Sequence, residues 1–242
     1  MISLLLISTN RYKQFVQPLL NGVIRNFLSN HQITVHLFTD ELQDLAGSDR
    51  VRIEQHIIPP YRFPDATLMR YRVFTNHAHL IKGDFCIYMD VDMSIEMEVG
   101  DTFLSGDIIA VRHPGFWYNN GWGSGANSPE SKSYFEPELR KGYCAGGVQG
   151  GRTEKYLEIC KLLADNIDDD TARGVLAEWH DETHWQAALS VFIPRDHPDW
   201  IINELTPEYC SVLSEHQRTL WEINHLPARI IALEKDHTLI RS

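Results

Sequence analysis

The sequence predicts an α/β fold built on a mostly parallel sheet. Short apolar runs typical of buried strands alternate with segments whose apolar residues recur at the helical spacing of three and four. We expect strands at 3–8, 33–38, 51–58, 85–89, 108–112 and 229–233, and helices at 15–28, 66–81 and 154–167. Strands that alternate with helices in this order imply a parallel, doubly wound architecture.

Helical periodicity supports the three helix assignments. Helix 15–28 gathers its apolar residues on one face, and helix 66–81 follows Asp65, a residue type that commonly caps helix N-termini. Helix 154–167 leads into the acidic run 168–170, which we expect to be a solvated loop.

Glycine-rich stretches interrupt this alternation in the second half of the chain. The stretch 113–142 is rich in Gly, Asn, Ser and Pro with interleaved aromatic residues, and loops of this length are commonly functional or disordered. After it, the segment 146–151 is mostly glycine, which allows either close backbone approach to a ligand or tight turns between elements.

Length, composition and charge exclude several classes of protein. At 242 residues, with 43% hydrophobic and 23% charged residues, the chain resembles a soluble globular protein with one large α/β domain or two small ones. Its net charge of −11 argues against a nucleic-acid-binding protein. No apolar run approaches the roughly 18 residues of a membrane span, and segment 1–8 lacks the basic start of a signal peptide. Four cysteines without CxxC spacing are expected to be free buried thiols, as in a reducing cytosol.

Two carboxylates, Asp90 and Asp92, directly follow the apolar run 85–89. In open α/β sheets, ligands bind outside the carboxyl ends of strands. Two carboxylates there are costly to bury unless a cation pairs with them, and Mg²⁺ or Mn²⁺ prefers oxygen ligands while leaving positions for substrate phosphates. We therefore expect a metal that holds a phosphorylated substrate. The alternative is a strand-to-loop turn with solvated acids.

The segment 179–186 carries His180 and His184 at the i, i+4 spacing of zinc-binding helices. Zinc peptidases place a glutamate directly after the first histidine, whereas here Asp181 holds that position and Glu182 follows it. A zinc hydrolase therefore stays an alternative, beside a plain helix N-terminus whose acids are favoured by the helix dipole.

The chain ends in a segment that carries Lys235 and Arg241 around His237. A basic end on an acidic protein is able to fold over a bound phosphate and become ordered. The alternative is a frayed polar tail, because chain ends are commonly mobile.

Taken together, these segments match a known family in order and spacing. The sequence resembles the retaining α1,3-galactosyl- and N-acetylgalactosaminyltransferases of glycosyltransferase family 6, the ABO blood-group type, from about residue 4 to 241. The resemblance rests on VHLFTD at 35–40, MR at 69–70, DVDM at 90–93, HP at 113–114, AGG at 145–147, GG at 150–151, WHDETH at 179–184, PEY at 207–209 and the basic tail. Each motif is weak alone, but together they are specific.

The resemblance implies a GT-A glycosyltransferase fold in one catalytic domain over 1–242. A Rossmann-like nucleotide-binding half, about 1–112, is fused to an acceptor-binding half, about 113–242, whose tail closes over the donor. The implied donor is a UDP-sugar, with Mn²⁺, or Mg²⁺ in its place, as cofactor. The implied acceptor is an oligosaccharide or glycolipid with a β-galactoside, fucosylated or plain. The oligomeric state is not readable from the sequence.

The resemblance also assigns residues to the donor site. Asp90 and Asp92 match the metal-binding acids, with Val91 beside the ribose, and Arg70 matches an arginine that contacts the donor. Tyr12 would stack on the uracil, and the positions that hold uridine are Ile7, Thr9 and Tyr12. Residues near the sugar and diphosphate are His180, Asp181, Lys235 and Arg241.

Glu182 matches the catalytic glutamate of the family. Retention of configuration allows Glu182 to attack the anomeric carbon in a double displacement, or to stabilise an oxocarbenium-like centre while the acceptor attacks from the leaving-group face. The sequence does not decide between these routes. The acceptor-binding residues that the resemblance implies are His113, Trp179 and Glu182.

The triplet Ala145, Gly146 and Gly147 matches the residues that lie against the sugar 2-substituent and the acceptor. Glycine at the third place leaves room for an N-acetyl group, so we expect UDP-GalNAc in preference to UDP-galactose. Ala145 departs from the bulkier residues usual at the first place, which leaves acceptor preference open.

Two further expectations concern the type of enzyme. The sequence shows neither the membrane anchor nor the stem of the animal Golgi enzymes, which indicates a cytoplasmic enzyme of bacterial or viral type. Both metal acids are retained, so we expect metal dependence. An inactive nucleotide- or carbohydrate-binding module stays an alternative beside the zinc hydrolase.

Overall fold

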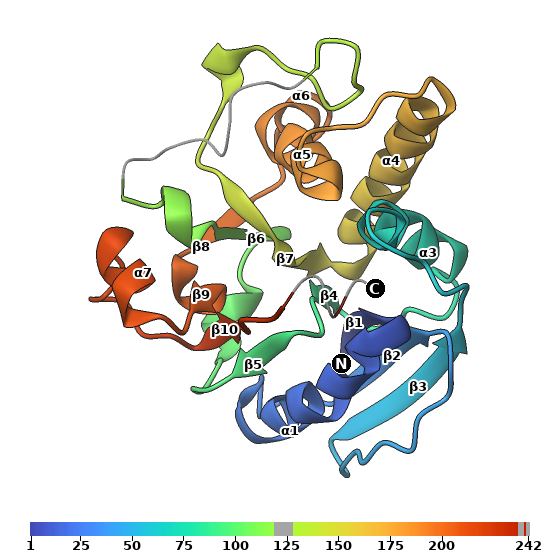
Figure 1. Ribbon diagram of the computed structural model, residues 1–242, viewed down its shortest axis with the longest axis vertical. Helices are drawn as coiled ribbons and strands as arrows, with labels where there is room; N and C mark the ends of the chain where they lie inside the picture. Colours follow the sequence, from blue (N-terminus) through green and yellow to red (C-terminus); the bar gives the residue numbers. More distant parts are fainter. Residues whose placement is uncertain (119–127, 237–239, 241–242) are drawn as a thin grey trace.

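The structure is a computed structural model that describes residues 1–118, 128–236 and 240. A seven-stranded sheet with the order β3-β2-β1-β4-β7-β6-β8 forms its centre (Figure 1). The strands are β1 (Ile2–Ser8), β2 (Ile33–Thr39), β3 (Val51–Ile57), β4 (Phe85–Met89), β6 (Ile108–Arg112), β7 (Cys144–Arg152) and β8 (Ile202–Leu205). A three-stranded sheet lies beside it, formed by β5 (Met93–Ile95), β10 (Ile230–Ala232) and β9 (Ser211–Val212).

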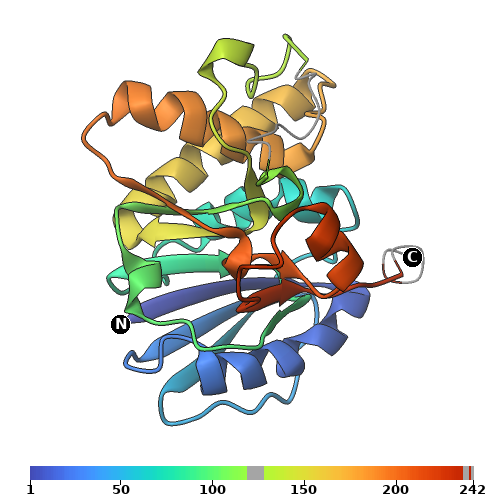
Figure 2. The same ribbon diagram turned by 90° about the vertical axis from the view of Figure 1, so that its left-hand side faces the viewer.

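Helices cover both faces of the large sheet, as Figure 2 shows. On one face, α1 packs through Val16, Leu19, Leu20 and Val23, which recur at the predicted helical spacing. On the other face lie α3, α4, α5 and α6. The helix bounds are α1 (Val16–Asn26), α2 (Asp65–Leu68), α3 (Arg70–Asn76), α4 (Thr153–Ala172), α5 (His180–Ala187), α6 (Ile193–Asp196) and α7 (Glu215–Leu220).

The prediction of a mostly parallel sheet is only partly correct. Strands β3, β2, β1 and β4 are parallel, but β7 runs antiparallel between β4 and β6. The glycines expected to allow either close approach to a ligand or tight turns between elements lie inside β7. At Gly150 an added Cβ would lie 2.5 Å from the carbonyl oxygen of Cys86, so the close approach of β7 to β4 requires glycine there.

Two helix predictions need correction. The predicted helix 66–81 is two short helices, α2 and α3, joined at Met69; Asp65 lies in the first turn of α2, and Pro64 holds the N-cap position. The acidic run 168–170 belongs to α4 rather than to a loop. Its last residue, Asp170, is buried and accepts hydrogen bonds from Ser131 Oγ at 2.6 Å and from the Lys132 amide at 2.8 Å. The burial of Asp170 was not predictable from the acidic run itself, because the residues that bind it lie far away in the chain.

The cysteine prediction is confirmed, because Cys86, Cys144, Cys160 and Cys210 are all free and buried. Over the described residues, no helix combines the length and the apolar character needed to cross a membrane.

Candidate active site

A cleft opens at the carboxyl ends of β1 and β4, where the sequence placed the metal site. It encloses about 860 Å³, part of which is open to solvent. The residues of the cleft that the sequence assigned to the donor site are Ile7, Thr9, Tyr12, Arg70, Asp90, Val91, Asp92 and Lys235. The lining residues that the sequence did not indicate are Asn10, Tyr61, Arg62, Phe63, Ala66, Thr67, Tyr88 and Ile240.

The buried guanidinium of Arg70, at the start of α3, connects several parts of the site. Its Nη2 lies 3.1 Å from Asp90 Oδ1, and its Nη1 lies 2.7 Å from Asp181 Oδ2. Nη1 also donates to the Gly146 carbonyl at 2.8 Å, and the guanidinium stacks 4.0 Å from the centre of the Tyr88 ring. Only arginine has enough donors in a rigid fork to serve these partners together, so Arg70 ties the ends of β4, β7 and α5 to one another.

The two aspartates after β4 are held by the backbone on either side. The Asp90 amide donates to the Gly147 carbonyl at 2.8 Å, and the Asp92 carbonyl accepts from the Leu233 amide at 2.9 Å. The Asp90 carboxylate also accepts the Tyr88 hydroxyl. The Asp92 carboxylate pairs with the ammonium of Lys235. The segment after β10 is thereby brought over the cleft.

Lys235 faces the mouth of the cleft from the chain end that the sequence assigned to the diphosphate. Its Nζ lies 5.2 Å from the ring centre of Tyr12, within the range of a cation–π contact. Arg241 and His237 lie outside the described residues.

Glu182, in the first turn of α5, directly follows Asp181, whose carboxylate pairs with Arg70. Its Oε2 accepts the Gly146 amide at 2.6 Å, and its Oε1 accepts the Tyr143 hydroxyl. Burial raises the pKa of the Glu182 carboxyl to about 7, although both hydrogen bonds oppose this rise. Burial likewise raises the pKa of Asp181 to about 6, against the lowering effect of Arg70. Perturbed carboxyl groups beside a cleft are typical of catalytic sites.

Gly146 is the residue that lets Glu182 approach the strand. A Cβ at this position would lie 3.2 Å from Glu182 Oε2 and 3.3 Å from Glu182 Cβ. At the next position, a Cβ on Gly147 would lie 2.9 Å from Asp90 Oδ2 and 2.6 Å from Met93 Cε. The absence of a Cβ at Gly146 therefore makes room for Glu182, and its absence at Gly147 makes room for Asp90.

His113 directly follows β6 and borders a group of aromatic rings. Its ring centre lies 5.0 Å from Phe116, 5.7 Å from Tyr143 and 6.5 Å from Trp221. Its Nδ1 accepts the Gly115 amide at 3.1 Å, and burial lowers its pKa to about 4. A neutral ring that accepts at Nδ1 carries its proton on Nε2, so His113 offers a hydrogen-bond donor beside apolar ring faces.

The remaining predicted residues are dispersed around this centre. The His180 ring packs against Phe63 of the cleft, with ring centres 5.0 Å apart. Trp179 is 51% exposed, whereas Ala145 is 3% exposed and packs in the core on the α1 face.

The zinc alternative finds no support in the arrangement of α5. His184 is buried, and its Nε2 lies 3.5 Å from Asp170 Oδ2, away from the cleft. His180 turns to Phe63 instead, and over the described residues the two histidines belong to no metal-binding group.

Of the cleft-lining residues that sequence reasoning missed, Tyr88 is the one that contacts Asp90, and two residues outside that lining, Tyr143 and Gln149, were missed as well. Tyr88 lies on β4 two positions before Asp90, on the same strand face, which is a signal that the sequence carries. Tyr143 and Gln149 were not indicated by any motif. Gln149 is fully buried, donates to the Gly146 carbonyl at 2.9 Å and thereby holds the strand that positions Glu182.

The chain is similar in sequence to known proteins. The model of glycosyltransferase family 6 matches residues 1–242. The chain belongs to glycosyltransferase family 6. It is 25% identical over 249 residues to the rat histo-blood group ABO system transferase 1, covering 100% of this chain and 68% of the relative. It is 29% identical over 202 residues to the dog globoside α-1,3-N-acetylgalactosaminyltransferase 1, covering 76% of this chain and 55% of the relative.

The protein is therefore a glycosyltransferase, a hexosyl-transferring enzyme with a GT-A-type α/β fold, as the resemblance predicted. Neither the zinc hydrolase nor the inactive binding module gains support from these comparisons.

Proposed function

We propose that the protein transfers N-acetylgalactosamine from UDP-GalNAc to a β-galactoside in α1,3 linkage, with retention of configuration. The observation that carries this proposal is that buried Arg70 pairs with Asp90 in the cleft and also contacts Asp181 and Gly146, the chain neighbour and a hydrogen-bond partner of Glu182. Arg70 therefore links the proposed nucleotide site to the segments that position the proposed catalytic carboxylate. The names of the rat and dog relatives support transfer of a hexose or N-acetylhexosamine.

The donor half, about 1–112, supplies the nucleotide site in this proposal. Tyr12 offers a ring for the uracil, while Ile7, Thr9 and Val91 line the cleft beside it. The carboxylates of Asp90 and Asp92 are hard oxygen donors, which fits Mn²⁺ or Mg²⁺, and members of the family commonly need a divalent metal. When bound, such an ion would supply positive charge for the departing diphosphate.

Lys235 has two roles in this scheme. Its ammonium pairs with the Asp92 carboxylate. If Asp92 were to hold a metal ion, the ammonium of Lys235 would be free to pair with the diphosphate, where negative charge develops as UDP leaves. Arg241 would add charge at the same place. The net charge of −11 is no obstacle, because positive charge is concentrated at the reacting end of the donor.

Glu182 is the proposed catalytic residue. The hydrogen bonds from Tyr143 and Gly146 favour its ionised form and fix the direction of both oxygens. An ionised carboxylate so held can serve either as the nucleophile of a double displacement or as the stabiliser of an oxocarbenium-like centre. Both routes need the carboxylate unprotonated, so activity should rise as the pH rises through about 7.

The acceptor half, about 113–242, offers the surface around His113. Aromatic faces with a few placed polar groups are typical of small-ligand sites. The rings of Phe116, Tyr143 and Trp221 provide apolar faces for a galactose, and Nε2 of His113 provides a donor for one hydroxyl. Trp179, which is exposed, would extend this surface.

Gly147 supports GalNAc rather than galactose as the transferred sugar. This support comes from the match to the third place of the family triplet, where glycine leaves room for an N-acetyl group. In this chain the space beside the Gly147 Cα is taken by Met93 Cε and Asp90 Oδ2, so glycine there also accommodates these two side chains. Asp181 and His180 flank the same end of the cleft, so they are the side chains that we expect nearest to the donor sugar.

A donor comparison tests the proposal. We expect kcat/KM for UDP-GalNAc to exceed that for UDP-galactose, measured with plain and fucosylated β-galactosides, with an α1,3-linked product identified by NMR. A clear preference for UDP-galactose would overturn the choice of donor. A β-linked product would overturn retention, and turnover that is unchanged in the Glu182→Gln variant would overturn the proposed catalytic residue.

A further inference from the structure

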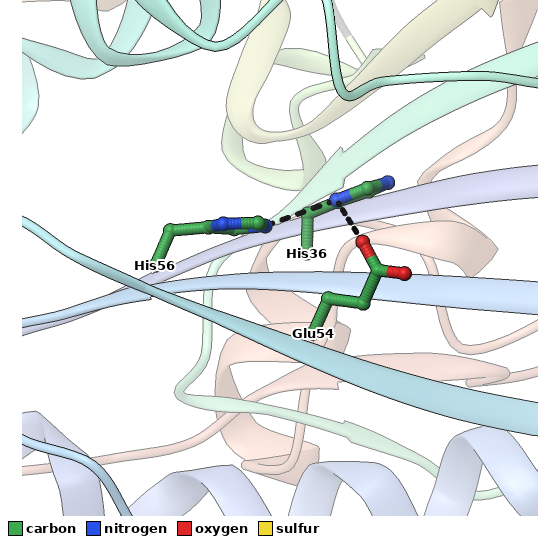
Figure 3. Close-up of side chains that lie close together, drawn as sticks. All are labelled: His36, Glu54 and His56. Atoms are coloured by element: carbon green, nitrogen blue, oxygen red, sulfur yellow. Dashed lines mark hydrogen bonds and ion pairs between the residues drawn. The ribbon is translucent and has the colours of Figure 1, made fainter.

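Two histidines and a glutamate form a compact cluster on β2 and β3, and none of them lines the active-site cleft (Figure 3). His36 lies opposite Glu54 in the parallel register of these strands, and Phe38 lies opposite His56. Since residues two apart on a strand share a face, all three side chains project from the same face of the sheet. Figure 3 shows their polar ends converging.

The distances within this cluster match those expected around one metal ion. His36 Nδ1 lies 3.2 Å from His56 Nε2 and 3.6 Å from Glu54 Oε2. Two nitrogen ligands of a tetrahedral Zn²⁺, each about 2.0–2.1 Å from the ion, lie about 3.3 Å apart. The three ligand atoms all lie within 4.8 Å of one another. A small rotation of the glutamate side chain therefore completes one face of a tetrahedron.

The hydrogen bonds around the cluster leave lone pairs turned inward. The hydroxyl of Ser3 donates its proton to the Lys82 carbonyl. Its oxygen can therefore only accept a hydrogen bond from His36 Nε2, which lies 3.3 Å away. His36 then carries its proton on Nε2 and a lone pair on Nδ1. Burial favours this neutral ring by lowering the pKa of His36. Arg52 lies 3.1 Å from the other oxygen of Glu54, which leaves Oε2 facing His36.

An imidazole lone pair and a carboxylate oxygen that face each other at 3.6 Å repel unless positive charge lies near both. A proton on His56 Nε2 would form a hydrogen bond to His36 Nδ1, but it would not remove the repulsion between His36 Nδ1 and Glu54 Oε2. A divalent cation at the centre would serve all three groups at once. The Ser3 and Arg52 contacts resemble the outer partners that orient ligands in established metal sites.

We propose that His36, Glu54 and His56 form a second metal site, selective for Zn²⁺ or a similar borderline cation. Two imidazoles and one carboxylate are a common zinc ligand set, whereas Mn²⁺ and Mg²⁺ favour all-oxygen sites. Glu54 and His56 are partly exposed on β3, the edge strand, so the ion can enter from solvent and water can take the fourth position. The ion would bind β3 to β2 at this edge of the sheet.

The test measures how many Zn²⁺ ions bind per chain when the proposed metal ligands of the active site are removed by substitution. We would use the double variant Asp90→Asn/Asp92→Asn, stripped with EDTA, and titrate it with Zn²⁺ by calorimetry and native mass spectrometry. We expect one Zn²⁺ per chain and a raised melting temperature. Adding His56→Gln or Glu54→Gln should weaken binding by at least about tenfold.

His31 provides a matched control, because its Nε2 lies 2.9 Å from the Asp101 carboxylate without a second histidine. The His31→Gln change should leave the binding constant unaltered. Co²⁺ used as a probe should give the intense visible absorption of a tetrahedral site, and His56→Gln should abolish it. Absence of a bound equivalent, or binding that is unchanged in both cluster variants, would overturn the proposal.

Discussion

Replacing Glu182 by glutamine should abolish transfer and yet stabilise the protein at neutral and alkaline pH. The Glu182 carboxyl has a raised pKa because it is buried. The folded state therefore holds a proton there that the unfolded state has already released. This proton-linked stability is fully present below about pH 4.5 and is lost as the pH rises through about 7. Glutamine resembles the protonated acid and avoids this loss.

The size of the effect follows from the two pKa values. An ordinary value of 4.5 in the unfolded chain and about 7 in the fold differ by about 2.5 units. At about 1.4 kcal/mol for each pH unit between these two values, the full loss in the free energy of unfolding is about 3.5 kcal/mol. About 2.5 kcal/mol of this loss, relative to the glutamine variant, falls between about pH 5 and pH 8. For a chain of this size, about 1 kcal/mol corresponds to roughly 2–4 °C in melting temperature.

Urea denaturation at about pH 5 and pH 8 measures this difference directly. Glu178→Gln serves as the matched control, because Glu178 is exposed and lies four residues before Glu182, outside α5. We expect the stability gain of Glu182→Gln over wild type to grow with pH and that of Glu178→Gln to stay constant. A gain that is equal at both pH values would refute the assignment of a raised pKa to Glu182.

Three further results follow from the same geometry. The Gly147→Ala change places a Cβ 2.9 Å from Asp90 Oδ2, so it should weaken the binding of Mn²⁺. It should also shift the ratio of the kcat/KM values of the two donors about tenfold towards UDP-galactose. An unaltered Mn²⁺ titration would contradict this prediction. Arg70→Lys should destabilise the fold by about 3 kcal/mol in urea, because one ammonium cannot serve Asp90 and Asp181 together; a change below about 1 kcal/mol would contradict it. The kcat/KM for donor should rise with pH through about 7 in wild type, following Glu182, and a flat profile would exclude this dependence.

The strands, and the place of Asp90 and Asp92 at the cleft, were predictable because their signals are local. Asp90 and Asp92 end a short apolar run, and such a run is itself evidence of a buried strand. The order of motifs then added Arg70 and Glu182 to the same site. The alternation of strands and helices correctly indicated the layers on both faces of the sheet.

Pairings between distant segments were not predictable from one sequence. Nothing in the chain shows that Arg70 meets Asp181, or that Asp170 turns inward to Ser131, because both pairs depend on how α3 and α4 pack. Strand β7 was missed for a different reason. Its glycines carry little strand propensity, and only the close backbone of β4 explains why they are needed.

UDP release from UDP-GalNAc tests the central claim most directly. It should be measured with a β-galactoside acceptor, in Mn²⁺ or in excess EDTA, for wild type and Glu182→Gln. We predict release that requires the acceptor and the metal and that falls by orders of magnitude in the variant. Release that is undiminished in EDTA, or equal in the variant, would contradict a metal-dependent transferase whose catalytic carboxylate is Glu182.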